Sequence, residues 1–281
     1  MIASAKELEM QASDYRAVER AIFFFNENRN GRPPDAQLAA AAGLDEAELR
    51  RLLARWGGIS PGCLGEALST SANRRRLEES RPRIAAAAPA LTVTWEETGS
   101  GGRGAGLRIA WGVHPSPFGG CLLGVSQKGI VSLNFVPGED REAAVAGMKE
   151  DWPGAEFVEA PEVTGPLAER VFSDPEGLGV FLRGTRFQIR VWRALLDIPM
   201  GALDCYSAVA ARAGRPDAVR AAASAVGDNP VSYLIPCHRV IRSNGEMSDY
   251  RWGRARKQAL QLWEATRCGA LASPLEKSMA Q

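Results

Sequence analysis

The chain has few of the side chains that bind metals or form disulfide frameworks. Its 281 residues include only two histidines and five cysteines. The cysteines are odd in number and widely spaced, and no Cys-x-x-Cys pair is present. A disulfide framework and a zinc site are therefore not expected. We predict a protein that works without a metal or a cofactor.

Long apolar runs are also missing. None approaches the roughly 18 residues that a membrane-spanning helix needs, and the N-terminus has no apolar signal-peptide region. We expect a cytoplasmic protein with reduced thiols and no membrane partner. The composition, 45% hydrophobic and 24% charged, is that of a folded chain and excludes extensive disorder. The length favours two or three small globular units.

Charge is close to balanced over the whole chain but is concentrated in one part of it. The formal net charge is +1, yet residues 183–270 carry fourteen basic and seven acidic side chains, and thirteen of the fourteen are arginine. Arginine suits contacts to phosphates and base edges. This part of the chain therefore favours a nucleic-acid partner, with a merely solvated basic surface as the alternative.

The first third of the chain has the pattern of a helix-turn-helix. Residues 15–28 place apolar side chains at helical spacing. An Ala-rich helix follows, and Gly43 breaks it. Asp45 can then cap a second helix, with Glu48 completing a capping-box pattern. We predict a helical, helix-turn-helix-like domain over residues 1–79.

The middle of the chain has the pattern of a small α/β domain. Residues 80–106 are rich in Ala, Gly and Ser and predict a linker. Three strand-like runs between 107 and 136 predict an antiparallel meander, and helical patterns follow at 141–152 and 165–173. We place this domain at 107–175.

The last unit, predicted at 180–270 and followed by a tail at 271–281, begins with a helix that Thr185 can cap. Two short helical segments follow, one after Ser207 and one after Pro216. The second of them is small and Ala-rich, so it can approach another backbone closely.

The reactive segment comes after these helices. It runs from Asn229 to Val240 and contains Pro236, Cys237, His238 and Arg239 in direct succession. A thiolate nucleophile needs its pKa lowered by a nearby base or cation, and the two residues after the cysteine are candidates for this. A buried structural cysteine beside a surface histidine is the alternative. Adjacent side chains usually point apart, so a bridging water is plausible between thiol and imidazole.

The motif Ile-Pro-Cys-His-Arg-Val resembles the active-site signature of the O6-methylguanine-DNA methyltransferase family, and residues 183–265 are similar to that family nearly throughout. The resemblance implies that Cys237 accepts the alkyl group. It implies that His238 and Glu264 relay the thiol's proton through a water, and that Asn229 braces the active-site turn.

The same resemblance assigns residues to DNA and to the substrate pocket. Arg220 matches the arginine finger that fills the gap left by a flipped nucleotide, and Tyr206 matches the tyrosine that helps to rotate the nucleotide and protonates the leaving guanine. Arg239 is expected at the DNA, and Tyr250 and Pro236 at the alkyl pocket.

The chemistry that the resemblance implies is a single, stoichiometric transfer. Sulfur attacks the alkyl carbon of O6-alkylguanine in double-stranded DNA, neutral guanine leaves, and a stable thioether remains. O4-alkylthymine is a further candidate substrate. The implied fold is mixed α/β, with a ribonuclease-H-like middle domain and a winged-helix-like C-terminal domain, in a monomer associated with the nucleoid through DNA.

The N-terminal part resembles an AraC-type helix-turn-helix in an Ada-like arrangement, with Leu49, Arg51 and Leu53 at that motif's Leu, Arg and aromatic positions. Two departures matter. The sequence has no Cys-rich zinc domain, and one helix-turn-helix stands where the AraC type carries two. Glu46 and Glu48 would also oppose phosphate. We therefore expect the N-terminal part to be a structural or weakly DNA-binding appendage.

Two other functions compete with alkyl transfer for the whole protein. One is an alkylation-responsive regulator with little repair activity, and the other is a cysteine hydrolase.

Overall fold

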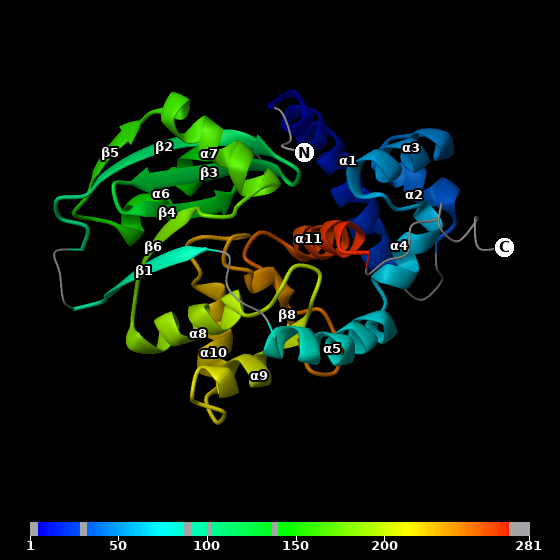
Figure 1. Ribbon diagram of the computed structural model, residues 1–281. Helices are drawn as coiled ribbons and strands as arrows, with labels where there is room; N and C mark the ends of the chain where they lie inside the picture. Colours follow the sequence, from blue (N-terminus) through cyan, green and yellow to red (C-terminus); the bar gives the residue numbers. More distant parts are fainter. Residues whose placement is uncertain (1–4, 29–32, 87–90, 100–102, 137–139, 270–281) are drawn as a thin grey trace.

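The computed structural model describes residues 5–28, 33–86, 91–99, 103–136 and 140–269. Helices of the N-terminal part, a mixed sheet, and a second helical part pack against one another in this chain (Figure 1). The predicted tail at 271–281 lies outside the described residues. The observed fold class is mixed α/β, as predicted.

The N-terminal part is helical and contains the predicted helix-turn-helix. Its helices are α1 (Ala5–Glu27), α2 (Asp35–Ala42), α3 (Glu46–Gly57), α4 (Pro61–Ala67) and α5 (Thr70–Ala85). Gly43 ends α2 in the left-handed region, with φ of 75°, which a glycine adopts without strain. The side chain of Asp45 accepts from the Glu48 amide while the Glu48 side chain accepts from the Asp45 amide. The turn and the capping box predicted from the sequence are thus both present.

A mixed sheet forms the middle of the chain. Its described strands are β1 (Thr92–Glu97), β2 (Arg108–Ser116), β3 (Gly119–Ser126), β4 (Gly129–Phe135), β5 (Glu156–Glu159) and β6 (Gly179–Gly184). They lie in the order β1-β6-β4-β3-β2-β5. Strands β2, β3 and β4 form the antiparallel meander that the sequence predicted, and β5 runs parallel to β2.

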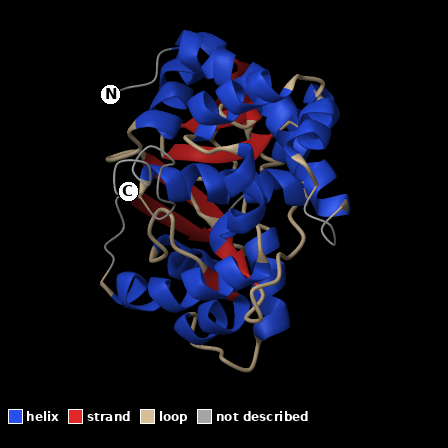
Figure 2. Cartoon of the chain, turned by 90° about the vertical axis from the view of Figure 1, so that its right-hand side faces the viewer, coloured by secondary structure: helices blue, strands red, loops and turns tan. Residues whose placement is uncertain are grey.

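Helices α6 (Arg141–Asp151) and α7 (Pro161–Ser173) cover opposite faces of this sheet. Neighbouring side chains of a strand point to opposite faces. Accordingly, Leu122 joins the apolar cluster that contains Met148 of α6, whereas Leu123 joins the cluster that contains Val171 of α7. Figure 2 shows the strands enclosed by helices on both sides.

The prediction of a linker at 80–106 is wrong for part of this segment, because residues there belong to a helix and to a strand. Helix α5 continues to Ala85, and strand β1 pairs in parallel with β6 at the edge of the sheet. Strand β1 begins with the alternation of a half-buried strand, since Val93 and Trp95 are partly buried whereas Thr92 and Thr94 are exposed. Strand β6 also belongs to this sheet, although the sequence placed it in the C-terminal domain.

The C-terminal part holds helices around a two-stranded parallel ribbon. Its elements are α8 (Arg186–Leu196), β7 (Asp204–Cys205), α9 (Tyr206–Arg212), α10 (Val219–Gly227), the 3-10 turn η3 (Cys237–Arg239), β8 (Val240–Ile241) and α11 (Arg254–Arg267). Thr185 caps α8, as its position predicted, and Gln188 completes a capping box that was not predicted. Helix α11 lies between the sheet and the N-terminal helices (Figure 1), and its residues from 255 to 265 are all buried.

One aromatic ring joins the three parts of the molecule. Phe118, between β2 and β3, makes edge contacts with Tyr15 of α1, with Trp56 of α3 and with Trp263 of α11, at centroid distances of 6.3, 6.2 and 5.4 Å. The Trp56 indole also donates to the Pro117 carbonyl at 2.8 Å. The N-terminal helices are therefore packed into the core of the rest. Within the described residues, no helix combines the length and the apolar character required to cross a bilayer.

Candidate active site around Cys237

The side chain of one buried asparagine, Asn229, makes three hydrogen bonds in the turn that carries Cys237. The amide nitrogen of Asn229 donates to the Ile235 carbonyl at 2.7 Å and to the Cys237 sulfur at 3.2 Å. Its oxygen accepts from the Val231 amide at 3.0 Å. Tyr233, within the turn, has a positive φ of 67°, a backbone conformation that a bulky residue adopts only when its surroundings impose it. Asn229 thus braces both the backbone and the thiol.

Cys237 opens the 3-10 turn and is 4% exposed. Burial raises the pKa of its thiol, while the Asn229 hydrogen bond and the charge of Lys257 act in the opposite direction. The sequence suggested a thiol with a lowered pKa, and the structure corrects this. The resting group is the protonated thiol, so it needs a base to take its proton as it reacts.

His238 and Glu264 form a buried pair beside this thiol. The Nε2 of His238 lies 2.8 Å from Glu264 Oε1, and both side chains are at most 1% exposed. The other ring nitrogen, Nδ1, is buried and has no hydrogen-bond partner among the residues that the structure describes. Burial lowers the pKa of His238, so the ring is neutral near pH 7. With Nε2–H held by the carboxylate, Nδ1 can accept a proton.

The carboxylate of Glu264 is kept ionised in this buried position. Burial acts to raise its pKa, but Arg239 and His238 outweigh burial and hold the pKa well below its usual range. Arg239 donates to this carboxylate through Nε at 2.9 Å and through a terminal nitrogen at 2.8 Å, and also to the Ile198 carbonyl. The Gly201 amide donates to the second oxygen at 3.2 Å.

These contacts give Arg239 a different place from the one predicted. The sequence assigned it to DNA, whereas the structure turns its guanidinium inward onto Glu264, with the side chain 13% exposed. A cation at this point is needed because an isolated buried carboxylate would be neutralised by a proton. We therefore assign Arg239 to the support of the His238 and Glu264 pair.

The two predicted tyrosines both lie close enough to the thiol for Cys237 to affect their pKa values. Tyr250 is buried deeply enough that burial, followed by the charge of Cys237, raises its pKa well above 10. Tyr206 begins α9, and its hydroxyl lies 2.7 Å from Ser248 Oγ. Burial also raises the pKa of Tyr206, and Cys237 contributes to this shift. Pro236, directly before the thiol, is buried.

Arg220 stands apart from this buried group. It lies in the first turn of α10 and is exposed. The structure therefore brings together Asn229, Cys237, His238 and Glu264, and leaves Arg220 on the surface.

Sequence reasoning missed a buried lysine. Lys257 is 1% exposed and donates to Ser248 Oγ at 2.7 Å. Burial lowers its pKa to about 8. In the sequence it stands out only as one of the fourteen basic residues of 183–270. Lys257 lies on α11, whose residues from 255 to 265 are all buried. The polar side chains in this stretch of the sequence gave no sign of that burial.

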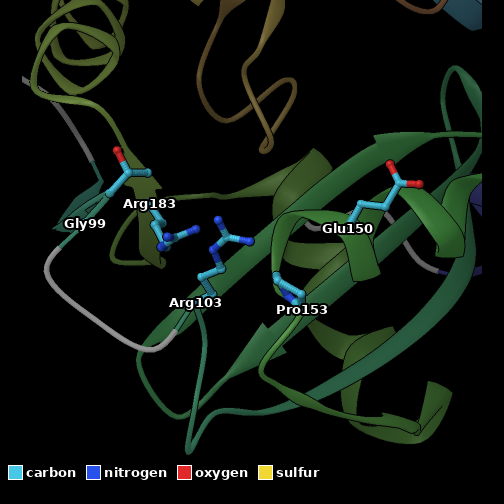
Figure 3. A pocket seen from close by; sticks show the side chains of 6 residues that line it. Gly99, Arg103, Glu150, Pro153 and Arg183 are labelled. Atoms are coloured by element: carbon cyan, nitrogen blue, oxygen red, sulfur yellow. The ribbon is translucent and has the colours of Figure 1, made fainter.

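A separate pocket lies at the sheet and involves other residues. It has a volume of about 330 Å³ and is lined by Thr98, Gly99, Arg103, Glu150, Pro153 and Arg183. Figure 3 shows the guanidinium groups of Arg103 and Arg183 close to each other, with the Glu150 carboxylate directed away from them. None of these residues belongs to the predicted site. Among the described residues, no group of three or more His, Cys, Asp or Glu side chains is placed to hold a metal ion.

Comparison with known proteins agrees with the C-terminal signature. The family model for the 6-O-methylguanine DNA methyltransferase DNA-binding domain matches residues 186–266. The bifunctional transcriptional activator/DNA repair enzyme Ada of Escherichia coli is 34% identical over 209 residues, which cover 72% of this chain and 57% of Ada. The regulatory protein ada of Salmonella typhimurium is 32% identical over 251 residues, or 82% of this chain and 70% of that protein.

Shorter relatives match as well. The inducible methylated-DNA–protein-cysteine methyltransferase of Bacillus subtilis is 37% identical over 141 residues, covering 47% of this chain and 77% of the relative. The crystal structure of Mycobacterium tuberculosis O6-methylguanine methyltransferase aligns with a TM-score of 0.46 and 27% identity, covering 62% of this chain and 99% of that one. The chain belongs to the methylated-DNA–protein-cysteine methyltransferase family.

Proposed function

We propose that this protein repairs DNA by transferring the alkyl group of O6-alkylguanine to Cys237, once per molecule. The observation that carries the proposal is the arrangement of one nucleophile and one base. A buried thiol held by Asn229 precedes a neutral imidazole whose other nitrogen is fixed by Glu264. This is the arrangement of an activated thiol nucleophile.

The reaction follows from these contacts. The thiol proton passes to Nδ1 of His238 through a bridging water, and the ionised Glu264 stabilises the imidazolium that forms. The sulfur attacks the alkyl carbon, a C–S bond forms, and the bond from that carbon to O6 breaks. The departing guanine takes a proton from Tyr206. The product is a thioether, which water does not cleave, so the protein is consumed.

The depth of the thiol requires the base to leave the duplex. Cys237 is 4% exposed, and a base within a stacked duplex cannot reach it. Flipping costs a few kcal/mol, and least for a base that is already mispaired. In this proposal Arg220, which is exposed at the start of α10, fills the vacated position, and the arginines of residues 183–270 supply contacts to phosphates. The reaction takes place in the cytoplasm, on the nucleoid, where the thiol stays reduced.

Peptide mapping tests this proposal directly. The protein is mixed with a duplex containing one O6-methylguanine, or with the same duplex containing guanine, then digested and analysed by mass spectrometry. We expect one added methyl group on the Cys237 peptide with the first duplex only. The other four cysteines serve as internal controls, and methylation spread over several of them would contradict the proposal.

A second candidate, an alkylation-responsive regulator, rests on the helix-turn-helix of α2 and α3. Arg50 and Arg51 are exposed on α3, and Glu48, which would oppose phosphate, is engaged in the capping box. Selection of bound sequences from random duplexes tests this. An enriched sequence motif that is lost in the doubly substituted Arg50→Ala, Arg51→Ala protein supports regulation, and the absence of any enriched motif refutes it.

A further inference from the structure

Lys257 stands at the buried end of a hydrogen-bonded chain. Its ammonium nitrogen lies 2.7 Å from Ser248 Oγ, and that oxygen lies 2.7 Å from the hydroxyl of Tyr206. Lys257 is 1% exposed and Ser248 is 8% exposed. The three polar groups therefore form an unbroken path from a buried cation to the hydroxyl of Tyr206.

The chemistry of the three groups gives this path a direction. An ammonium group carries donors and no acceptor, so Ser248 Oγ must accept from Lys257. The hydrogen of the Ser248 hydroxyl is then available to Tyr206, whose own hydrogen can point toward a bound base. The order of donors runs from Lys257 through Ser248 to Tyr206, which is the direction that proton delivery requires.

The surroundings of Lys257 favour release of its proton. Burial lowers its pKa to about 8, and the charge of Arg254, on the same helix, acts in the same direction. Cys237 and Asp249 act in the opposite direction. The result is a stronger acid than an exposed lysine, with a pKa close to the working pH, where general acids are most effective.

We propose that Lys257 supplies the proton that neutralises the leaving guanine, acting through Ser248 and Tyr206. The proposal rests on the alkyl-transfer function proposed above. As the bond from the alkyl carbon to O6 breaks, its electron pair stays on the guanine. Tyr206 then gives its proton to the base, Ser248 gives one to Tyr206, and Lys257 gives one to Ser248. Lys257 ends neutral, and the thiol's proton remains separately on His238.

Lys257 and Ser248 are positioning residues in this scheme, because only Tyr206 contacts the base. A competing role for Lys257 is electrostatic, since its charge also lowers the pKa of Cys237. The two roles differ in one respect. A proton supply matters only when the leaving group needs a proton, whereas support of the thiolate matters for every alkyl donor.

The test therefore compares two methyl donors. One is a duplex containing O6-methylguanine, and the other is methyl iodide, whose iodide leaves without a proton. The single-turnover rate of Cys237 methylation is followed by mass spectrometry for wild type, Ser248→Ala, Ser248→Thr and Lys257→Met. Gln258→Met is the matched control, because Gln258 is also buried on α11 but pairs with Asn26 of α1 instead.

We expect Ser248→Ala and Lys257→Met to slow transfer from DNA by about 100-fold, the usual contribution of a general acid. Ser248→Ala leaves the methyl iodide rate unchanged, Ser248→Thr restores transfer from DNA, and Gln258→Met has the wild-type rates. The proposal is overturned if Ser248→Ala slows both donors alike or slows neither. If wild type reacts with methyl iodide but never with the duplex, the alkyl-transfer function itself has failed, and this proposal fails with it.

Discussion

Arg239 and Glu264 form the ion pair on which the reactive histidine depends. Both Nε and a terminal nitrogen of Arg239 donate to the Glu264 carboxylate, at 2.9 and 2.8 Å, and the same carboxylate holds His238. Arg239, which directly follows Cys237 and His238 in the sequence, thus keeps the buried Glu264 carboxylate ionised. The chain supplies base, orienting anion and supporting cation from two short segments.

Replacement of that carboxylate tests this arrangement. Glu264→Gln keeps the shape of the side chain but removes the charge that stabilises the imidazolium, so the transfer rate should fall by about 100-fold. It also leaves Arg239 without its anion, which should cost roughly 3 kcal/mol of unfolding free energy. Single-turnover kinetics and urea unfolding measure the two effects. The control is Glu246→Gln, since Glu246 is an exposed glutamate paired with Arg242; a wild-type transfer rate in Glu264→Gln would refute the role of the pair.

The stability of the protein should fall in acid, and the onset should depend on His238. Its pKa is lowered below 6.5 by burial, so the folded state favours the neutral ring. That contribution is complete above pH 6.5 and is lost as the pH falls below it. The pKa of Glu264 is held below 4.5, the usual value for a glutamate. Glu264 therefore adds a further loss of stability as the pH falls below 4.5. Urea unfolding from pH 8 to 4 should give a shallower decline in His238→Gln; identical profiles would contradict the assignment.

Lys257 should reduce stability at neutral pH. Its pKa falls from 10.5 to about 8 on folding, which corresponds to a penalty of roughly 3 kcal/mol when it is charged. In Lys257→Met the hydrogen bond to Ser248 is lost, which offsets about 1 kcal/mol of the gain in unfolding free energy. Lys257→Met should therefore raise the unfolding free energy at pH 7, and the gain should shrink as the pH rises from 8 to 10.5. A loss of stability at pH 7 would show that the lysine is retained for packing.

Arg220 should affect DNA binding without affecting the thiol. It is exposed at the start of α10, so Arg220→Ala should leave thermal stability and the reaction of Cys237 with methyl iodide unchanged. Affinity for the lesion duplex should fall by about tenfold, because a charged contact at the flipped base is lost. Arg215→Ala is the control, as Arg215 is also exposed but is already paired with Asp217. If both substitutions lowered the affinity for the lesion duplex equally, Arg220 would be only a general phosphate contact.

Features set by neighbouring residues could be predicted from the sequence. The capping box at Asp45 and the helix cap at Thr185 each join residues three positions apart, and the meander follows from alternation within short runs. The reactive segment could be identified in the same way, since Cys237 and His238 are adjacent. Such features depend on local geometry, which a sequence pattern records directly.

Features that depend on distant segments could not be predicted. Strand β1 is a strand because β6 offers it an edge almost ninety positions later, as in the pairing of Thr92 with Gly179. The raised pKa of Cys237 and the chain from Lys257 to Tyr206 follow from burial and from helix α11 reaching the centre of the molecule. No local pattern specifies either, because burial is decided by the packing of the whole fold.

The measurement that tests the central claim most directly is the intact mass of the protein after titration with a duplex that carries one O6-methylguanine. The account predicts the mass of one added methyl group, reaching one per protein and no further however much duplex is supplied, and no change of mass in Cys237→Ala. Repair of many lesions by each protein molecule, or methylation that persists in Cys237→Ala, would contradict it.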